Sequence, residues 1–135
     1  MEAEIIDLLI EAKRAFDLSL LLITHDLGVV ARAADRVAVM YAGRIVECGT
    51  AREIFHAPLH PYTRGLLASI PGRTPGRRLH AIGGAVPSPA ALPPGCAFAP
   101  RCAERMPRCE TAHPETVAPG PGREVRCFLH QAGRA

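Results

Sequence analysis

The amino-acid sequence predicts an α/β fold with parallel strands and helices, then a hairpin, and finally an irregular, cysteine-rich C-terminal extension. Helical and strand-like patterns alternate over the first half of the 135 residues, as they do where helices connect parallel strands. The composition then changes, because residues 71–135 hold 19 of the 25 prolines and glycines. At about 29% of that segment, these residues make regular secondary structure scarce. We therefore expect one packed core and a tail that is mostly loop.

The first elements are read from hydrophobic periodicity. Between residues 4 and 16 the apolar residues recur at steps of three and four, which predicts a surface helix with one buried stripe. Leu18–Thr24 is a short apolar run without helical period, which indicates a strand buried on both faces of a mostly parallel sheet. Leu27–Ala34 is again helical, and Arg36–Tyr41 reads as a second strand.

Turn and capping residues define the following elements. A turn at Tyr41–Arg44 with an extended partner at Ile45–Cys48 predicts a hairpin. Thr50, with a glutamate three residues later, forms a capping box that begins a short helix. Pro61 occupies the first position of a further helix, for which His60 is the expected cap.

Composition excludes several classes of function. The chain has no tryptophan, two tyrosines and four phenylalanines, so a base-stacking surface would have little material and we expect no nucleic-acid partner. The start lacks a basic segment followed by a long apolar one, and the longest aliphatic stretch, Leu20–Ile23, is far too short to span a bilayer. We therefore expect a soluble, cytosolic protein whose thiols stay reduced.

Two groups of residues are candidates for chemistry. His25 and Asp26 follow the predicted strand, at the edge where open α/β sheets bind ligands. From position alone, the His25 imidazole either donates to an anionic ligand or bonds nearby backbone. The second group has the spacing C-x5-C-x6-C-x17-C and consists of Cys96, Cys102, Cys109 and Cys127.

The four cysteines are interpreted as metal ligands, because a proline-rich segment that buries little apolar surface gains folding free energy from a bound metal. Their spacing matches neither zinc knuckles nor bacterial ferredoxins, so it does not identify the metal. A mixed site that includes His80, His113 or His130 stays open, as does a tail with four reduced thiols. Cys48, in the hairpin, is expected to be a small buried apolar residue.

The sequence then resembles a known family. The run LLLITHDLGVVARAADRVAVMYAGRIVECGTAREIFHAPLHPYTRGLLASIPG, with VPSP, LPPGCAFAPRC and a final cysteine after it, looks like the C-terminal part of the ATP-binding subunit of oligopeptide/dipeptide ABC transporters. The resemblance extends from about Glu4 to about His130. THD is similar to the switch motif of all ABC ATPases, and HPYTRGLL with the cysteine-rich loop resembles the peptide-import branch. By this resemblance, residues 1–55 are the end of an ABC ATPase domain and residues 56–135 the transporter's C-terminal extension.

The resemblance implies roles for individual residues. His25 would be the switch histidine that contacts the γ-phosphate of ATP, bound with Mg²⁺ in the complete subunit, and Asp26 would complete the motif. The four cysteines would hold a [4Fe-4S] cluster, as in some members of the family. The partners would be a second ATPase subunit, two membrane permeases and, indirectly, a peptide-binding protein. The assembled subunit would lie in the cytoplasm, peripheral on the inner face of the cell membrane.

The chain also departs from the family. It contains no G-x-x-x-x-G-K-[ST] loop to cradle phosphates and no LSGGQ-like signature, and the Walker B strand would have to precede Met1. The sequence is therefore interpreted as a fragment that starts just past the D-loop and is not expected to hydrolyse ATP alone. The alternative is a four-cysteine metal-binding, iron-sulfur or zinc, regulatory module without ATPase activity.

Overall fold

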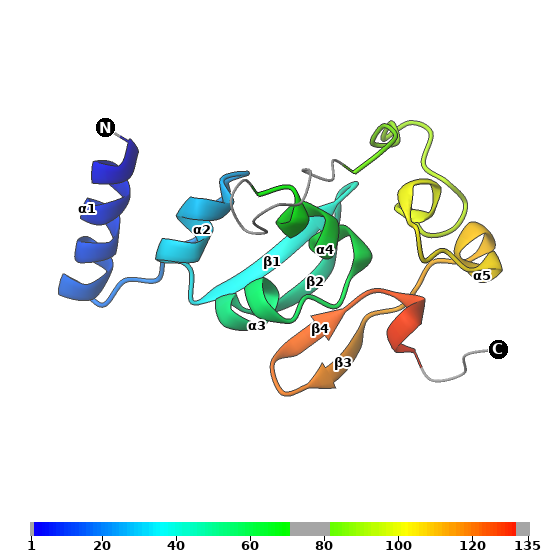
Figure 1. Ribbon diagram of the computed structural model, residues 1–135. Helices are drawn as coiled ribbons and strands as arrows, with labels where there is room; N and C mark the ends of the chain where they lie inside the picture. Colours follow the sequence, from blue (N-terminus) through cyan, green and yellow to red (C-terminus); the bar gives the residue numbers. More distant parts are fainter. Residues whose placement is uncertain (1, 71–81, 132–135) are drawn as a thin grey trace. The chain divides into compact units, whose positions relative to one another are not determined.

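The structure, a computed structural model, describes residues 2–70 and 82–131 (Figure 1). The chain forms two compact units, Met1–Asp35, here called unit 1, and Arg36–Ala135, called unit 2. Unit 1 carries the helices α1 (Glu2–Ala15) and α2 (Leu27–Ala33). Unit 2 carries β1 (Arg36–Tyr41), β2 (Arg44–Thr50), α3 (Ala51–His56), α4 (Pro61–Ala68), η1 (Ala99–Arg101), α5 (Pro107–Thr111), β3 (Val117–Gly120), β4 (Arg123–Val125) and η2 (Phe128–His130).

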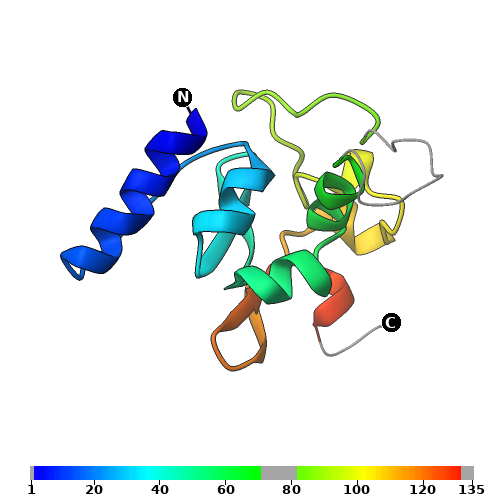
Figure 2. The same ribbon diagram turned by 60° about the vertical axis from the view of Figure 1, so that its left-hand side comes forward.

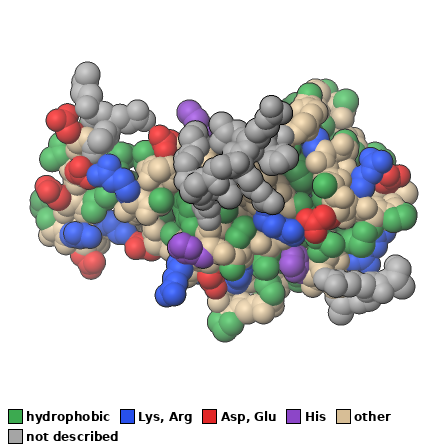
Figure 3. All heavy atoms as spheres, viewed as in Figure 1, with side chains coloured by type: hydrophobic (Ala, Val, Ile, Leu, Met, Phe, Trp, Pro, Cys, Tyr) green, Lys and Arg blue, Asp and Glu red, His purple; other side chains and the backbone are tan. Residues whose placement is uncertain are grey.

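The two helices of unit 1 form where periodicity predicts them. Two ion pairs connect α1 to α2 and to the segment after it. Arg32 of α2 pairs with Asp7 of α1, and Lys13 of α1 pairs with Asp35, two residues beyond α2. Among the described side chains of unit 1 only that of Ile6 is buried. Figure 3 shows apolar side chains on the surface of α1 among acidic and basic ones.

The strand predicted over Leu18–Thr24 is wrong for this structure. The segment forms neither helix nor strand, and the side chains of Leu21 and Ile23 are 88% and 90% exposed. A strand obtains its hydrogen bonds from neighbouring strands, and every strand of the described residues lies in unit 2. The expected parallel pairing is therefore not formed, and the sheet of the mixed fold is antiparallel.

That sheet has the strand order β1-β2-β4-β3. The predicted hairpin is confirmed: Tyr41 lies opposite Arg44, and the two residues between them, Ala42 and Gly43, have φ of +47° and +76°. Positive φ at both central residues is the requirement of a type I′ turn, whose twist matches that of the strands. The hairpin of β3 and β4 projects from the rest of unit 2 in both ribbon views (Figure 1, Figure 2).

The C-terminal segment shares a sheet with the first half of the chain. Glu47 of β2 lies opposite Val125 of β4, and the backbone N–H of Arg126 donates to Val46 at 2.8 Å. The compact units divide at residue 35, and the predicted domain boundary near residue 55 stays a prediction. Long-range strand pairing of this kind is not visible in local sequence patterns.

An aromatic cluster forms the main core of unit 2. The ring centroids of Tyr41 and Tyr62 are 4.7 Å apart, and those of Tyr41 and Phe98 are 5.2 Å apart with nearly perpendicular planes, an edge-to-face arrangement that stabilises aromatic pairs. A second cluster consists of Ala99, Cys109 and Phe128. The tail is mostly loop, as predicted, but its aromatic residues are buried. Among the described helices, none has the length and apolar character needed to cross a membrane.

Candidate functional site

His25 and Asp26 lie between the irregular segment of unit 1 and α2. The backbone N–H of Asp26 donates to the hydroxyl of Thr24 at 3.0 Å. The Asp26 carboxylate accepts from the N–H groups of Gly28 and Val29 at 2.7 and 3.1 Å, which makes Asp26 the N-cap of α2. His25 is exposed, so its imidazole is accessible to a ligand.

The four cysteines of the second group line one cavity in unit 2. They come from three segments: Cys96 and Cys102 flank η1, Cys109 belongs to α5, and Cys127 immediately precedes η2. None of them forms a disulfide. The other residues that line the cavity are largely apolar or aromatic, and His60 contributes an imidazole ring to the lining. Cysteines separated by up to 31 positions therefore meet at one place.

Burial controls the ionisation of three of these thiols. It raises the pKa of Cys96 and of Cys102, and it raises the pKa of Cys127 to about 11. Mutual repulsion of the neighbouring thiolates contributes in the same direction. Without a cation the thiols of Cys96, Cys102 and Cys127 are thus held in the protonated form, which is a poor nucleophile.

The chemical type of these donors favours a metal site, whereas their arrangement does not. Four thiols around a largely apolar cavity are the donors that soft metal ions and iron-sulfur clusters use. Within residues 2–70 and 82–131, however, no group of three or more His, Cys, Asp or Glu side chains has the arrangement of a metal-ion site. The cavity therefore gathers suitable donors without holding them at coordination distances from one ion.

Two arginines connect segments of the C-terminal tail. Arg101 donates to the carbonyl oxygens of Gly83 and Ile82 at 2.8 and 3.0 Å. Arg108 of α5 donates to the Phe128 carbonyl at 3.0 Å, and its guanidinium lies 4.2 Å from the centroid of the Phe128 ring, a cation–π contact. Arg108 thereby joins the helix of Cys109 to the segment of Cys127.

His60 connects the cavity to the sheet. It is 1% exposed, and its Nδ1 accepts from the N–H of Tyr62 at 3.0 Å, which confirms it as the cap of α4. Burial lowers the pKa of His60 to about 4 although Glu47 acts in the opposite direction. His60 is therefore neutral at pH 7, and its unprotonated Nδ1 is the nitrogen that accepts the capping hydrogen bond. His56 and His113 are exposed, and His80 lies outside the described residues.

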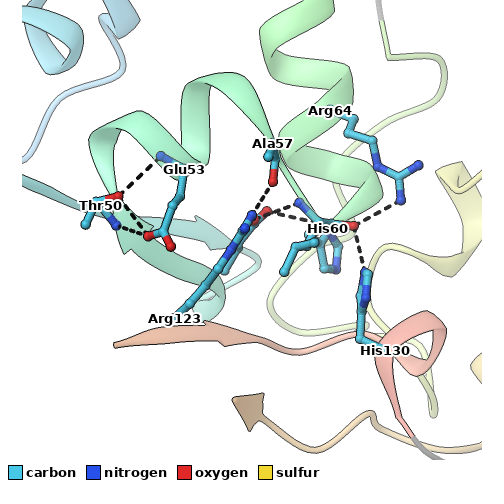
Figure 4. Close-up of polar contacts among 9 residues, drawn as sticks. Thr50, Glu53, Ala57, His60, Arg64, Arg123 and His130 are labelled. Carbon is cyan, nitrogen blue, oxygen red and sulfur yellow. Dashed lines mark hydrogen bonds and ion pairs between the residues drawn. The ribbon is translucent and has the colours of Figure 1, made fainter. Parts of the chain in front are cut away.

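A buried carboxylate, which the sequence analysis did not single out, holds the loop between α3 and α4. Glu47 is fully buried and accepts from the N–H groups of Leu59 and His60 at 2.7 and 2.9 Å. Arg123 of β4 pairs with Glu47 at 3.4 Å and also donates to the Ala57 carbonyl. Figure 4 shows Arg123, His60 and their neighbours converging on this loop. The sequence did offer a signal for this role, because Glu47 is a charged residue next to apolar residues of the hairpin strand.

The comparisons with known proteins agree with these motifs. Residues 46–109 match the family described as oligopeptide/dipeptide transporter, C-terminal region. The chain is 51% identical over 97% of its length to the oligopeptide transport ATP-binding protein AppD of Bacillus subtilis, and 48% identical over 96% to the dipeptide transport ATP-binding protein DppD of the same species. The oligopeptide transport ATP-binding protein OppD of Salmonella typhimurium is 46% identical over 95% of the chain.

The chain spans about 40% of the length of these relatives. The similarity nevertheless covers nearly every residue described above, from α1 to η2. The switch-like THD motif of unit 1 and the cysteine-lined cavity of unit 2 both lie within it. Residues 46–109 therefore belong to the oligopeptide/dipeptide transporter C-terminal region family, and the chain as a whole is a relative of peptide transport ATP-binding proteins.

Proposed function

We propose that this chain works within the ATP-binding subunit of an ABC importer for dipeptides or oligopeptides and helps to couple ATP binding and hydrolysis to peptide uptake. The observation that carries the proposal is 46–51% identity to three peptide transport ATP-binding proteins over 95–97% of the chain. Its partners are a second ATPase subunit, membrane permeases and, indirectly, a peptide-binding protein. Its place is the cytoplasmic face of the membrane. Residues 1–55 belong to the ATPase domain and residues 56–135 to the family's extension.

Within this function His25 is the switch histidine and reaches the γ-phosphate of ATP. Its support is the THD motif and an imidazole that is exposed beside a firmly capped helix. Hydrogen-bond donors aimed at the charge on a transferring phosphoryl group are the main catalytic means in this reaction. Asp26 fixes the turn after His25 through two backbone N–H groups. ATP supplies the phosphoryl group and Mg²⁺ offsets its charge when both are bound in the complete subunit.

The exposed apolar run of unit 1 supports the same function. Leu21 and Ile23 place large aliphatic side chains in solvent, and exposed apolar segments of this kind mark surfaces that another structure covers. We infer that Leu18–Thr24 becomes a buried strand in the complete ATPase domain. The remaining 60% or so of the relatives' length is the source of its neighbours.

A chimera tests this function. The 135 residues replace the matching part of Bacillus subtilis AppD, and ATP turnover is measured with the permeases present. We expect an active ATPase in which His25→Ala lowers turnover about 100-fold or more, the scale for loss of one preorganised donor. His56→Ala, another exposed histidine, is the matched control and retains activity. Full activity of the His25→Ala chimera contradicts the switch assignment, and an inactive chimera beside active AppD contradicts the function.

The chain alone provides a second test. It lacks a phosphate-cradling glycine loop with its lysine, and a single imidazole does not replace that loop. We expect isothermal titration with Mg-ATP to detect no tight binding. A dissociation constant in the low micromolar range contradicts the assignment of the chain to the part of the domain outside the phosphate-binding loop.

As a second function, we propose that Cys96, Cys102, Cys109 and Cys127 bind a thiolate-ligated metal group, with a [4Fe-4S] cluster preferred to zinc. The supporting observation is that all four thiols line one cavity. Such a group supplies a stable cross-link between the three segments of the tail. The similarity to transport ATP-binding proteins favours this site as a part of a transporter subunit and not as a separate regulatory module.

Anaerobic purification tests the cluster. The protein is expected to be brown and to absorb broadly near about 400 nm, a band that thiolate-bound iron gives and zinc does not. Replacing any of the four cysteines by serine removes the band, whereas Cys48→Ser, outside the cavity, leaves it intact. Iron content below about 0.5 per chain in anaerobic preparations contradicts the cluster, and zinc analysis of the same samples then decides whether zinc takes its place.

A further inference from the structure

Two of the four cysteines are joined through their backbones. The N–H of Cys96 donates to the carbonyl oxygen of Cys109 at 2.8 Å, across 13 positions of sequence. Cys96 precedes η1 and Cys109 lies in α5, and both line the same cavity. This hydrogen bond is therefore the direct connection between the first and second cysteine-bearing segments.

The residue before Cys96 determines how close the two segments approach. A Cβ atom built on Gly95 would lie 2.2 Å from the carbonyl oxygen of Cys109 and 2.7 Å from the carbonyl carbon of Glu110. Both are backbone atoms, which have no rotamer by which to move away. Any side chain at this position therefore forces the backbone of α5 away from Cys96.

Other glycines of unit 2 lack this constraint. A Cβ on Gly65 would meet only the flexible side chain of Ile82, at 2.8 Å, and a Cβ on Gly120 would meet nothing within 4 Å. Gly95 also has no positive φ, so its requirement for glycine comes from space and not from backbone conformation. The close approach is thus specific to the contact between the two cysteine segments.

The position of the Cys109 sulfur depends on that contact. Its Sγ accepts from the N–H of Met106 at 3.4 Å, and the carbonyl oxygen of Arg108 accepts from the N–H of Ala112 at 3.0 Å, so the short helix α5 is closed by its own hydrogen bonds. A shift of its backbone carries the sulfur with it. A Cβ on Gly95, 2.2 Å from the Cys109 carbonyl oxygen, would therefore displace the Cys109 sulfur relative to Cys96.

We propose that Gly95 is a positioning residue of the four-cysteine site: by letting the backbones of Cys96 and Cys109 touch, it brings their two thiols to one cavity. Only the identity of the ligand, a thiolate-bound metal group, rests on the proposed metal-binding function. The contact itself is made by backbone atoms of the protein chain.

The experiment measures the alkylation rate of each cysteine in the whole chain by mass spectrometry, with and without Zn²⁺ as the probe. In metal-free Gly95→Ala we expect Cys109 to react about tenfold faster than in the wild type, which corresponds to about 1.4 kcal/mol of local opening free energy. Zn²⁺ slows alkylation of all four cysteines in the wild type but no longer protects Cys96 and Cys109 in the variant. Gly120→Ala, which gains a Cβ in open space, and Cys48, outside the cavity, are the controls.

Two results overturn the proposal. One is wild-type reactivity of Cys96 and Cys109 in folded Gly95→Ala. The other needs no variant: hydrogen exchange of the Cys96 amide in the wild type at an unprotected rate shows that the backbone contact is not formed. If Zn²⁺ protects no cysteine of the wild type, metal binding fails while the alkylation and exchange rates still decide the role of Gly95.

Discussion

Unit 1 and unit 2 contain the same kinds of apolar residue in opposite surroundings. In unit 1 the side chain of Phe16 is 72% exposed, whereas in unit 2 that of Phe98 is 4% exposed. Unit 1 has the more regular sequence, with two helices that follow from periodicity. Unit 2 contains all 13 prolines of the chain, yet it forms the larger core. Regular local patterns therefore specify helices, but burial depends on partners that lie far away in the sequence.

The comparison also explains how a loop-rich segment becomes ordered. The tail contributes a few large anchors, such as Phe98 and Phe128, to clusters that include residues of the sheet and of α5. Arg101 and Arg108 donate to the backbone carbonyl oxygens of Ile82 and Phe128, respectively. Buried carbonyl groups need such partners wherever regular secondary structure does not provide them. Few anchors and many side-chain-to-backbone bonds replace the helices and strands that proline prevents.

The largest expected effect is that of truncating a phenylalanine in each unit. Phe98→Ala removes a ring packed against Tyr41 and Tyr62 and should lower the free energy of unfolding of unit 2 by about 3–5 kcal/mol. Phe16→Ala removes an exposed ring and should change stability by less than about 0.5 kcal/mol. Urea unfolding followed by tyrosine fluorescence measures this, because both tyrosines of the chain lie in unit 2. Equal effects of the two substitutions contradict the contrast between the units.

The sequence predicted the features whose signals are local, and it failed for a feature that depends on distant partners. The capping box at Thr50, the proline-initiated helix at Pro61 and the hairpin with its turn at Tyr41–Arg44 were predicted and are confirmed, because each signal involves residues within four positions of one another. The strand over Leu18–Thr24 was wrong for this chain, because a strand requires neighbours that periodicity does not reveal.

For the candidate sites, residue types were easier to predict than arrangement. The four cysteines were selected by residue type and by their place in the proline-rich tail, and all of them line one cavity of the structure. The roles of Glu47 and Gly95 were not predicted, because each depends on a partner 12 or more positions away. His25 and Asp26 were found through the motif, and their part in ATP binding stays a prediction.

The next effect is a pH dependence that belongs to unit 2. Burial lowers the pKa of His60 from its ordinary value of 6.5 to about 4, in a setting that also includes the charges of Glu47, Arg64 and His130. Between these two pKa values the unfolded chain binds the proton and the folded one does not, so stability falls as the pH falls. From pH 7 to pH 4 we expect a loss on the order of 3 kcal/mol, measured by urea unfolding at each pH.

A variant separates this titration from that of the carboxylates. His60→Asn keeps a side chain that caps a helix but has no proton to gain in this range. Its stability at pH 7 is expected to be lower than that of the wild type, and its profile between pH 7 and pH 5 to be flatter. A wild-type slope in His60→Asn assigns the pH dependence to other groups and contradicts the prediction.

The smallest effect compares one helix cap in each unit. Thr50 accepts from the N–H of Glu53 in unit 2, and Asp26 accepts from those of Gly28 and Val29 in unit 1. Loss of such a cap costs about 1 kcal/mol. Because α3 packs on β2 and buries Ile54, Thr50→Ala should lower the unfolding free energy of all of unit 2 by that amount.

The helix α2 has no buried residue, so Asp26→Ala should reduce its helical carbon chemical shifts and leave the tyrosine-detected midpoint unchanged. If Asp26→Ala shifts that midpoint as much as Thr50→Ala does, the two units unfold together and the contrast drawn from their burial is wrong.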